Sequence, residues 1–412
     1  MRIILFSLLA CLLVLPATSF AQDHEGEPQE EVTEDQNHEG ETHDGEHGDE
    51  HGDEHHDEKP YAERIIEHIS DANEFHLWGD VSIPLPCILY SFEDGLQVFS
   101  SKKFDHGHNA VHGYVSNHGD VMRIKDYSED MHVEHIDHVE EAETEDGGSI
   151  FYAMHGDEKY ELERASTLME FTSWIDFSIT KVVFTMLLTA ILLMVVWISV
   201  ARAYKNREGQ APKGMQNFFE VFFTFMRDEV VKPTIGAKYE RYMPFIMSLF
   251  FFILFSNILG LVPFFPGSGN VTGNLAVTLT LAVFTMVITN FSGNKHYWQH
   301  IFWMPGVPTP VRFILAPIEF AGIFIKPFTL LIRLFANITA GHIIILALVG
   351  MVFILGENGQ NTAGAGAGSV MSVAFVFIMN LLELLVAFIQ AFLFALLSSL
   401  YIGMAVEEHE HH

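Results

Sequence analysis

The sequence is poor in cysteine and in basic residues. It has 2 cysteines in 412 residues, and the first, Cys11, lies in an N-terminal apolar run. Loss of that run leaves Cys87 alone, so a secreted domain held together by internal disulfides is excluded. Lys and Arg number 22 against 53 Asp and Glu, a formal net charge of −31. No nucleic-acid partner is expected for so acidic a chain.

The charge is unevenly distributed along the chain. Residues 1–170 hold 41 acidic and 9 basic residues, a net charge of −32. Residues 171–412 hold 12 acidic and 13 basic residues, a net charge of +1. The first part is therefore expected to be an acidic water-soluble segment, and the second a nearly neutral apolar one.

The N-terminus has the three parts of a secretory signal peptide. Arg2 supplies a positive charge, Ile3 to Leu15 form an apolar core, and Ser19-Phe20-Ala21 is a small-x-small cleavage site. We predict a signal peptide over residues 1–21. An uncleaved anchor is disfavoured because the apolar run is too short to cross a bilayer comfortably.

Residues 22–60 contain almost nothing that could form a core. From Asp23 to Glu58 there are 17 acidic residues, 7 histidines and no Lys or Arg. Such a composition cannot bury enough apolar surface to fold, so we predict a disordered acidic, His-rich tail. Weak metal buffering is the alternative, since imidazole and carboxylate both ligate divalent ions. The repeat has no fixed ligand spacing, and no metal site is predicted.

Residues 61–170 change character. Helical periodicity from Tyr61 to Phe75 is followed by short strand-like runs separated by Gly, Asn and Asp. The runs are VSIPLPCILY, LQVFSS, VHGYVS and SIFYAM. We predict a small, irregular exported segment with some β character and no catalytic set. The histidines His106, His108, His112 and His118 are expected to be solvated loop residues.

Residues 171–412 read as an all-α polytopic membrane protein. Val182 to Val200 is an uninterrupted apolar run long enough to cross a bilayer. Basic residues follow at once (Arg202, Lys205, Arg207, Lys213), which places that end in the cytoplasm and the acidic segment outside. Four further spans are expected at about Tyr242–Val262, Asn274–Phe291, Leu330–Leu355 and Val370–Gly403. Five crossings put the C-terminus in the cytoplasm.

Three connecting segments complete this reading. Gln216 to Val231 is amphipathic and is expected to lie along the cytoplasmic surface. Phe313 to Ile325 carries Glu319 and is expected to be a separate tilted or interfacial helix that ends before Pro327. Gly356 to Ser369 is expected to be a flexible Gly-rich turn outside the membrane, so that the last two spans form a long tilted antiparallel helix hairpin.

The last two spans carry few polar side chains. Arg333 is unusual, because a charge at bilayer depth costs at least ~2.5–3.5 kcal/mol and Arg cannot discard its proton. In an antiparallel hairpin, facing residues have a nearly constant sum of positions. That rule pairs Arg333 with Gln390, and His342 with Glu383, at two different depths. Such a set of intramembrane ionisable groups favours an ion pathway over simple packing.

The sequence here resembles a known family. FTLLIRLFANITAGHIIIL, ELLVAFIQAFLFALLSSLYI and SNILGLVPF are similar to segments of subunit a of the F-type ATP synthases. The resemblance covers roughly residues 175–405. It implies a bacterial proton-conducting stator, without catalytic activity or a cofactor, beside a rotating ring of c subunits. It also implies the b-subunit peripheral stalk and the rest of the complex as partners, in the inner membrane with lipid around it.

The resemblance also implies roles for six residues. Arg333 matches the essential arginine that separates two half-channels, and His342 and Glu383 match the polar pair of the outer half-channel. Glu319, Asn337 and Gln390 match polar positions near the inner half-channel and the ring. A metal transporter with a His-rich tail, and a plain anchor for the acidic segment, are the rival hypotheses. The sequence leaves open whether the coupling ion is H⁺ or Na⁺.

Overall fold

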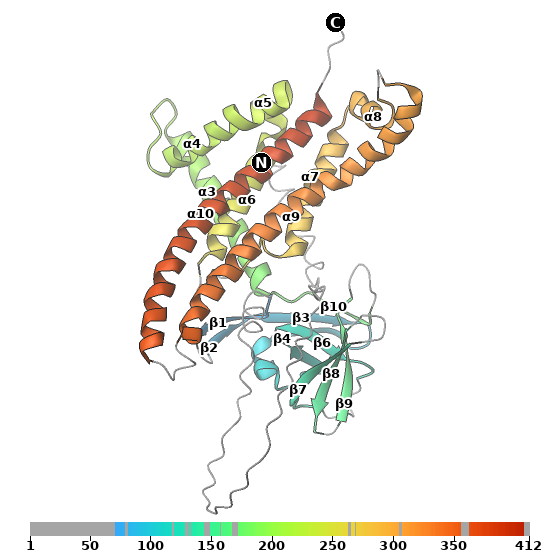
Figure 1. Ribbon diagram of the computed structural model, residues 1–412, viewed down its shortest axis with the longest axis vertical. Coiled ribbons are helices and arrows are strands. Elements are labelled where there is room, and N and C mark those ends of the chain that lie inside the picture. Colours follow the sequence, from blue (N-terminus) through green and yellow to red (C-terminus); the bar gives the residue numbers. More distant parts are fainter. Residues whose placement is uncertain are drawn as a thin grey trace, which may run out of the picture.

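The computed structural model describes residues 71–78, 81–117, 119–127, 131, 133–143, 149–156, 158–166, 172–262, 265–267, 269–304, 307–355 and 362–407. The predicted signal peptide, the acidic tail and residues 61–70 lie outside the described residues. Within them, the chain forms a β-rich region followed by a bundle of long helices (Figure 1). The expected helix reaching Phe75 is wrong at its end, because Glu74–Trp78 is strand β1.

Five helical segments are long and apolar enough to cross a membrane, as predicted. They contain α3 (Lys181–Asn206), α6 (Tyr239–Gly260), α7 (Leu275–Ser292), α9 (Thr309–Leu355) and α10 (Thr362–Val406). The amphipathic segment before α6 forms α4 (Met215–Phe225), a π-helical turn (Met226–Val231), α5 (Lys232–Ile235) and a 3₁₀ turn (Gly236–Lys238). The short helix α8 (Lys295–Phe302) precedes α9.

Large side chains on one helix pack against small side chains on another. Phe250 and Phe251 of α6 are almost fully buried, and α10 brings Ala387, Ala391 and Ala395 into the buried interior. Small residues let membrane helices approach closely, where dispersion forces replace the missing hydrophobic effect. Many other apolar side chains of α9 and α10 are exposed, as expected for surfaces that face lipid or partner subunits.

Two details of the last two helices differ from the prediction. α9 is one helix of 47 residues that contains Pro317 and Pro327, so the expected separate helix before Pro327 is wrong. Pro327 has no N–H for the Ile323 carbonyl one turn earlier, and membrane helices tolerate such prolines where neighbouring groups or local adjustments satisfy the freed carbonyl.

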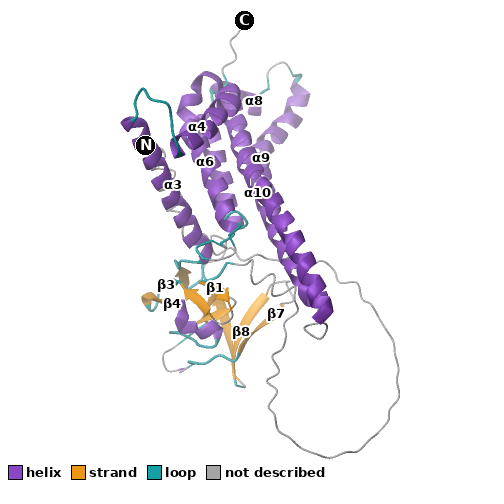
Figure 2. Ribbon diagram, turned by 90° about the vertical axis from the view of Figure 1, so that its left-hand side faces the viewer, coloured by secondary structure: helices purple, strands orange, loops and turns teal. Residues whose placement is uncertain are grey.

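The predicted Gly-rich turn is also partly wrong, because α10 begins at Thr362. Gly368 lies so close to α9 that a Cβ there would be 3.2 Å from that of Leu355. Gly368 therefore serves close helix packing instead of a loop. α9 and α10 run side by side from the end where they are joined and diverge toward α8 (Figures 1 and 2). Near the joined end, Ser372 Oγ donates to the Leu348 carbonyl at 2.8 Å.

The β-rich region is more regular than the sequence indicates. The described strands form three antiparallel sheets, ordered β1-β2, β10-β3-β4 and β5-β6-β9-β8-β7. Their bounds are β1 Glu74–Trp78, β2 Val81–Pro84, β3 Pro86–Ser91, β4 Gly95–Ser100, β5 Tyr114–Asn117, β6 Asp120–Ile124, β7 His138–Glu143, β8 Ser149–His155, β9 Glu158–Arg164 and β10 Trp174–Asp176, with a 3₁₀ helix at Ser101–Gly107. All four predicted runs contain strands. Cys87 is fully buried, in one apolar cluster with Trp174 and Tyr114.

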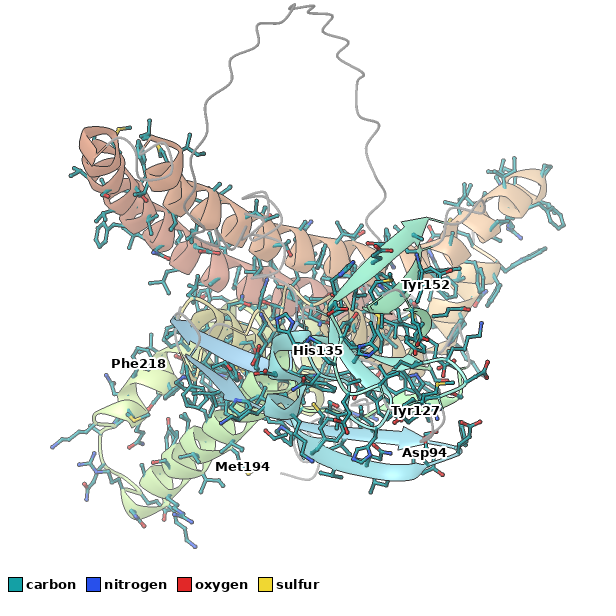
Figure 3. The ribbon with its side chains drawn as sticks, turned by 90° about the horizontal axis from the view of Figure 1, so that it is seen from below. Asp94, Tyr127, His135, Tyr152, Met194 and Phe218 are labelled. Carbon is teal, nitrogen blue, oxygen red and sulfur yellow. The ribbon has the colours of Figure 1, made fainter. Side chains whose placement is uncertain are left out.

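The β-rich region lies at one end of the helix bundle (Figure 2). Seen from that end, Met194 of α3 and Phe218 of α4 lie on the opposite side from α9 and α10 (Figure 3). The chain runs from β10 directly into α3. Asp71 fixes this junction, because its Oδ1 accepts from the backbone N–H of Val182 at 3.1 Å, in the first turn of α3.

Candidate functional site

Arg333 and Asn337 lie one turn apart on an exposed face of α9. Leu330, Leu331, Leu334 and Ile338 form the packed face of the same helix. Arg333 makes no ion pair with Glu319 or Glu383 within the described part of the chain. A helix face that presents a fixed cation outward, instead of pairing it internally, is suited to a partner with negative charge.

No hydrogen bond joins Arg333 and Gln390 among the described residues, and their pairing stays a prediction. Gln390 is buried, with 6% of its surface exposed, whereas Arg333 is exposed. The sum of two residue numbers in an antiparallel hairpin gives only the depth at which the residues face one another. The rotation of each helix about its axis decides whether their side chains touch. Here the leucines of α9 occupy the interface, and Arg333 lies beside it.

Glu383 of α10 is buried, with 3% of its surface exposed, and lies against the backbone of α9. A Cβ added at Gly341 would be 2.6 Å from Glu383 Oε1. Gly341 thus provides the space that the carboxylate occupies. The backbone of His342 comes next in α9, and its side chain lies outside the described part of the structure. The expected His342–Glu383 relay stays a prediction.

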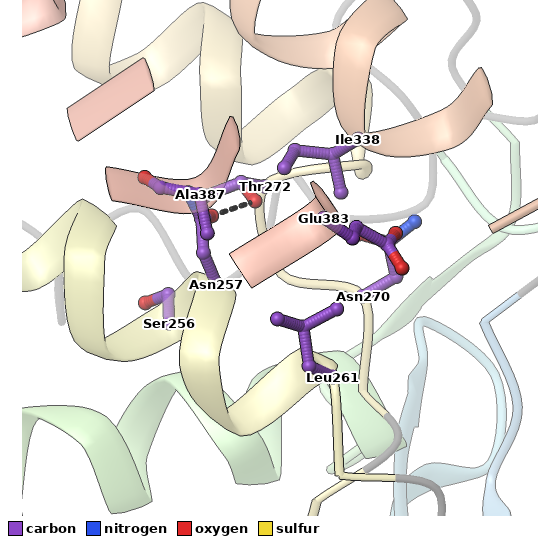
Figure 4. A pocket seen from close by; sticks show the side chains of 9 residues that line it. Ser256, Asn257, Leu261, Asn270, Thr272, Ile338, Glu383 and Ala387 are labelled. Atoms are coloured by element: carbon purple, nitrogen blue, oxygen red, sulfur yellow. Dashed lines mark hydrogen bonds between the residues drawn. The ribbon is translucent and has the colours of Figure 1, made fainter. Parts of the chain in front are cut away.

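A narrow polar pocket surrounds Glu383 and is called the outer pocket here (Figure 4). Its lining comes from α6, α9, α10 and the loop between α6 and α7. The lining residues are Ser256, Asn257, Gly260, Leu261, Asn270, Thr272, Ile338, Glu383 and Ala387. Asn257 Nδ2 donates to the Ala387 carbonyl at 3.2 Å, and Thr272 Oγ1 donates to Asn257 Oδ1.

Among the buried polar atoms of the outer pocket, two outside Glu383 have no hydrogen-bond partner among the described residues. They are Ser256 Oγ and Asn270 Nδ2. Leaving a buried donor unsatisfied costs ~1–3 kcal/mol, so such atoms in proteins usually bind water or another ligand. Asn270 and Glu383 lie side by side in the pocket (Figure 4), which places an amide donor next to a carboxylate.

A second polar pocket, the inner pocket, lies between α7, α8, α9 and α10. Its lining residues are Thr285, Met286, Thr289, Asn290, Tyr297, Ile323, Lys326, Pro327, Leu330 and Tyr401. The Tyr297 hydroxyl donates to Asn290 Oδ1 at 3.1 Å, and Lys326 Nζ is 5.6 Å from the centre of the Tyr401 ring. Burial, and then the nearby charge of Glu319, raise the pKa of Tyr297, so this hydroxyl stays a neutral donor.

Arg333 lies between the two pockets along α9. The inner pocket reaches α9 from Ile323 to Leu330, and the outer pocket reaches it at Ile338. The eight residue steps from Leu330 to Ile338 rise about 12 Å in a helix. On α10, Gln390 lies between Glu383 of the outer pocket and Tyr401 of the inner pocket. Two polar cavities are therefore offset in depth, with the fixed cation at the level between them.

Several lining residues were not predicted from the sequence. They lie outside the last two spans, on which the prediction rests: Asn257 on α6, Asn270 in the α6–α7 loop, Thr289 on α7 and Tyr297 on α8. The available signal was the presence of Asn and Thr within otherwise apolar runs, which calls for partners in a membrane. The described residues contain no group of three His, Cys, Asp or Glu arranged to hold a metal ion.

Comparisons with known proteins address the helical part and the β-rich region separately. Residues 182–403 match the model of the family described as ATP synthase A chain, and residues 64–146 match a domain family of unknown function (DUF8433).

Similar proteins named ATP synthase subunit a occur in several bacteria. That of Chloroherpeton thalassium is 44% identical over 240 residues, covering 57% of this chain and 69% of the relative. ATP synthase subunit a 2 of Chlorobaculum tepidum is 45% identical over 243 residues, covering 58% of this chain and 66% of the relative. The ATP synthase subunit a of Anaeromyxobacter sp. is 42% identical over 247 residues, covering 58% of this chain and 56% of the relative.

Proposed function

Because the chain belongs to the ATP synthase A chain family, we propose that it conducts protons past a rotating ring of membrane carboxylates through two offset half-channels. The outer pocket belongs to one half-channel and the inner pocket to the other. The observation that carries this proposal is the position of Arg333, at the level between two separate polar cavities.

The outer pocket supplies protons to the ring. A proton reaches Glu383 from outside the cell, and His342, one residue from the Gly341 backbone that Glu383 contacts, shares it. Asn270 presents its free amide group beside the carboxylate, where it can donate to the ionised form. The proton then neutralises a carboxylate of the ring, which can turn into lipid without the cost of a buried charge.

The inner pocket releases protons to the cytoplasm. After most of a turn, the ring carboxylate meets the level of Lys326, Tyr297 and Glu319. Glu319 is an exchangeable carboxylate near Tyr297, and the hydroxyl of Tyr297 holds Asn290 in place. Water in this pocket carries the proton away, since Thr289 Oγ1 also has no partner among the described residues.

Arg333 keeps the two paths apart. Its exposed guanidinium favours the ionised form of a ring carboxylate that faces it, which promotes proton release at this position. Its fixed positive charge also repels a proton that would cross directly between the pockets. Asn337, one turn away on the same face, adds an amide at the ring surface, and Gln390 lies behind it on α10.

This proposal places the chain as a stator. The exposed faces of α9 and α10 contact the c-subunit ring, and the other subunits, including the b-subunit stalk, hold the chain against rotation. The β-rich region lies outside the bacterial inner membrane and the C-terminus lies in the cytoplasm, as the basic residues after α3 support. The chain makes and breaks no covalent bond in ATP synthesis.

Replacement of Arg333 tests the proposal. Arg333→Ala is expected to abolish ATP-driven acidification of vesicles while the complex assembles in normal amounts, with increased passive proton permeability. Arg333→Lys is expected to be nearly as inactive, since Lys lacks the planar fork and can lose its proton when desolvated. Normal coupling in the assembled Arg333→Ala complex would contradict the proposal. Poor assembly instead would indicate a packing role.

A further inference from the structure

The β-rich region touches the loop that lines the outer pocket. Phe75 of β1 is buried, with 2% of its surface exposed, and packs edge-on against Phe265 of the α6–α7 loop at 5.4 Å between ring centres. Phe75 also packs edge-on against Phe184 of α3 at 5.4 Å. Phe184 and Phe265 are 5.7 Å apart, so the three rings form a closed cluster. One strand thus joins the β-rich region, the first span and the loop.

The same loop is fixed against α3 a few residues later. A Cβ added at Gly269 would lie 2.3 Å from Thr185 Oγ1 and 2.9 Å from the Lys181 carbonyl. Lys181 and Val182 are in turn bonded to the segment before β1, since Lys181 N–H donates to the Ala72 carbonyl at 2.8 Å. Phe265 and Gly269 of this loop therefore rest on a surface that the β-rich region and α3 build together.

Asn270 follows immediately after this fixed segment. It is buried, with 6% of its surface exposed, and its Oδ1 accepts from the Gly273 backbone N–H at 2.9 Å. That bond orients the carboxamide and leaves Nδ2 as the atom without a partner among the described residues, beside Glu383 in the outer pocket. Any shift of the loop moves this donor relative to the carboxylate.

We propose that the β-rich region acts as a clamp on the outer proton path: Phe75 and Phe265 hold the α6–α7 loop so that Asn270 is positioned beside Glu383. Phe75 and Phe265 are positioning residues, and Asn270 is the group that faces the carboxylate. This inference rests on the proposed function, because it assigns a role in proton uptake to a domain whose family is described as of unknown function.

The proposal accounts for why the β-rich region is bonded so closely to the first turn of α3. A tethered domain without a role in the pocket needs only a linker. Here the buried contacts converge on the loop that supplies Asn270, and small displacements of a group near the reacting atoms can cost up to about 100-fold in rate.

The test uses the assembled complex in vesicles, with passive proton uptake from the outer side as the readout. Phe265→Ala is expected to lower uptake by about 3- to 10-fold, the range that the loss of one aromatic pair produces. Phe265 is 38% exposed, so its ring edge can carry a hydroxyl, and Phe265→Tyr is expected to restore uptake. Phe75→Ala should match Phe265→Ala, and neither should reduce uptake much further in an Asn270→Ala background.

Two controls separate this effect from damage to the domain. Phe92→Ala changes an exposed ring of the β-rich region, and Phe99→Ala weakens a buried core that does not include the three-ring cluster. Both should keep normal uptake. The clamp proposal would be overturned if Phe99→Ala lowered proton uptake as much as Phe75→Ala and Phe265→Ala do. It would also be overturned if assembled Phe75→Ala and Phe265→Ala complexes kept normal uptake. If replacement of Arg333 left proton uptake by the otherwise wild-type complex unchanged, the proposed function itself would be overturned.

Discussion

The carboxylate of Glu383 on α10 occupies space left by the missing side chain of Gly341 on α9. A methyl group at position 341 would come within 2.6 Å of Glu383 Oε1, closer than real contacts allow. The atom that must move is the end of a flexible side chain, so the helices can stay in place while the carboxylate is displaced. Gly341 therefore fixes where Glu383 can hold a proton.

Gly341→Ala is expected to reduce proton uptake by about 10-fold or more while the complex assembles normally, because a carboxylate shifted by about 1 Å leaves its transfer geometry. Gly322→Ala is the matched control on the same helix, since a Cβ there meets nothing within 4 Å. Passive proton flux in vesicles, normalised to assembled complex, measures both. Equal flux in the two variants would show that Glu383 needs no fixed position.

Glu383→Gln and His342→Ala are each expected to slow proton uptake and to shift its pH dependence without unfolding the bundle. The amide cannot release a proton, and the alanine removes the group that titrates near neutral pH. The exchange of the two residues, His342→Glu with Glu383→His, is expected to recover part of the flux. A swapped variant that is no better than either single variant would count against a shared relay.

Asp176 makes the stability of the β-rich region depend on pH. Burial, followed by the charges of Asp120 and Asp71, raises its pKa from 3.8 to about 6, although hydrogen bonds with Ser178 oppose the shift. The folded state therefore binds this proton more tightly than the unfolded state. The stabilisation that protonated Asp176 gives the folded state is fully present below about pH 4 and is lost as the pH rises through 6.

Asp176→Asn is expected to slow amide hydrogen exchange in the paired strand β3 at pH 7–8, and to change it little at pH 4. The amide keeps an oxygen that can accept from the Ser178 backbone N–H, which lies 2.7 Å from Asp176 Oδ1. Glu161→Gln, at an exposed ion pair with Lys125, is the control and should change neither condition. Faster exchange in Asp176→Asn at pH 8 would contradict the sign of this coupling.

Deletion of residues 23–58 is expected to leave ATP-driven pumping intact, because a segment of this composition contributes no packed core. The measurement is acidification by vesicles that contain equal amounts of inserted protein. The variant should keep the signal peptide, so that export is unchanged. Loss of pumping at normal abundance would give the acidic tail a role in transport.

The sequence by itself determined the membrane class and the family resemblance of this protein. Apolar runs long enough to cross a bilayer have few other uses, so the spans around Val182 and Tyr242 could be predicted within a few residues. Strand-like runs around Cys87 and Phe151 were also found, because alternation with Gly and Asn breaks is a local signal. Arg333 stood out because a charge among apolar residues is costly wherever the chain folds.

Only the tertiary structure decided how the polar groups are arranged. The sum of positions gave the depth of Glu383, but in the structure Glu383 lies against the backbone of Gly341. Arg333 is exposed, whereas Gln390 is buried. Helix rotation depends on packing between Leu334 and the rest of the bundle, which no local pattern encodes.

The contacts of Phe75 and Asn270 were likewise hidden from the sequence. Phe75 and Phe265 are 190 positions apart, and their contact exists because α3 brings the β-rich region and the α6–α7 loop to the same place. Asn270 lies in a Gly-rich loop, where Asn is ordinarily a turn residue. It becomes part of a pocket only because the loop folds back beside α10, which is a property of the assembled helices and not of the loop.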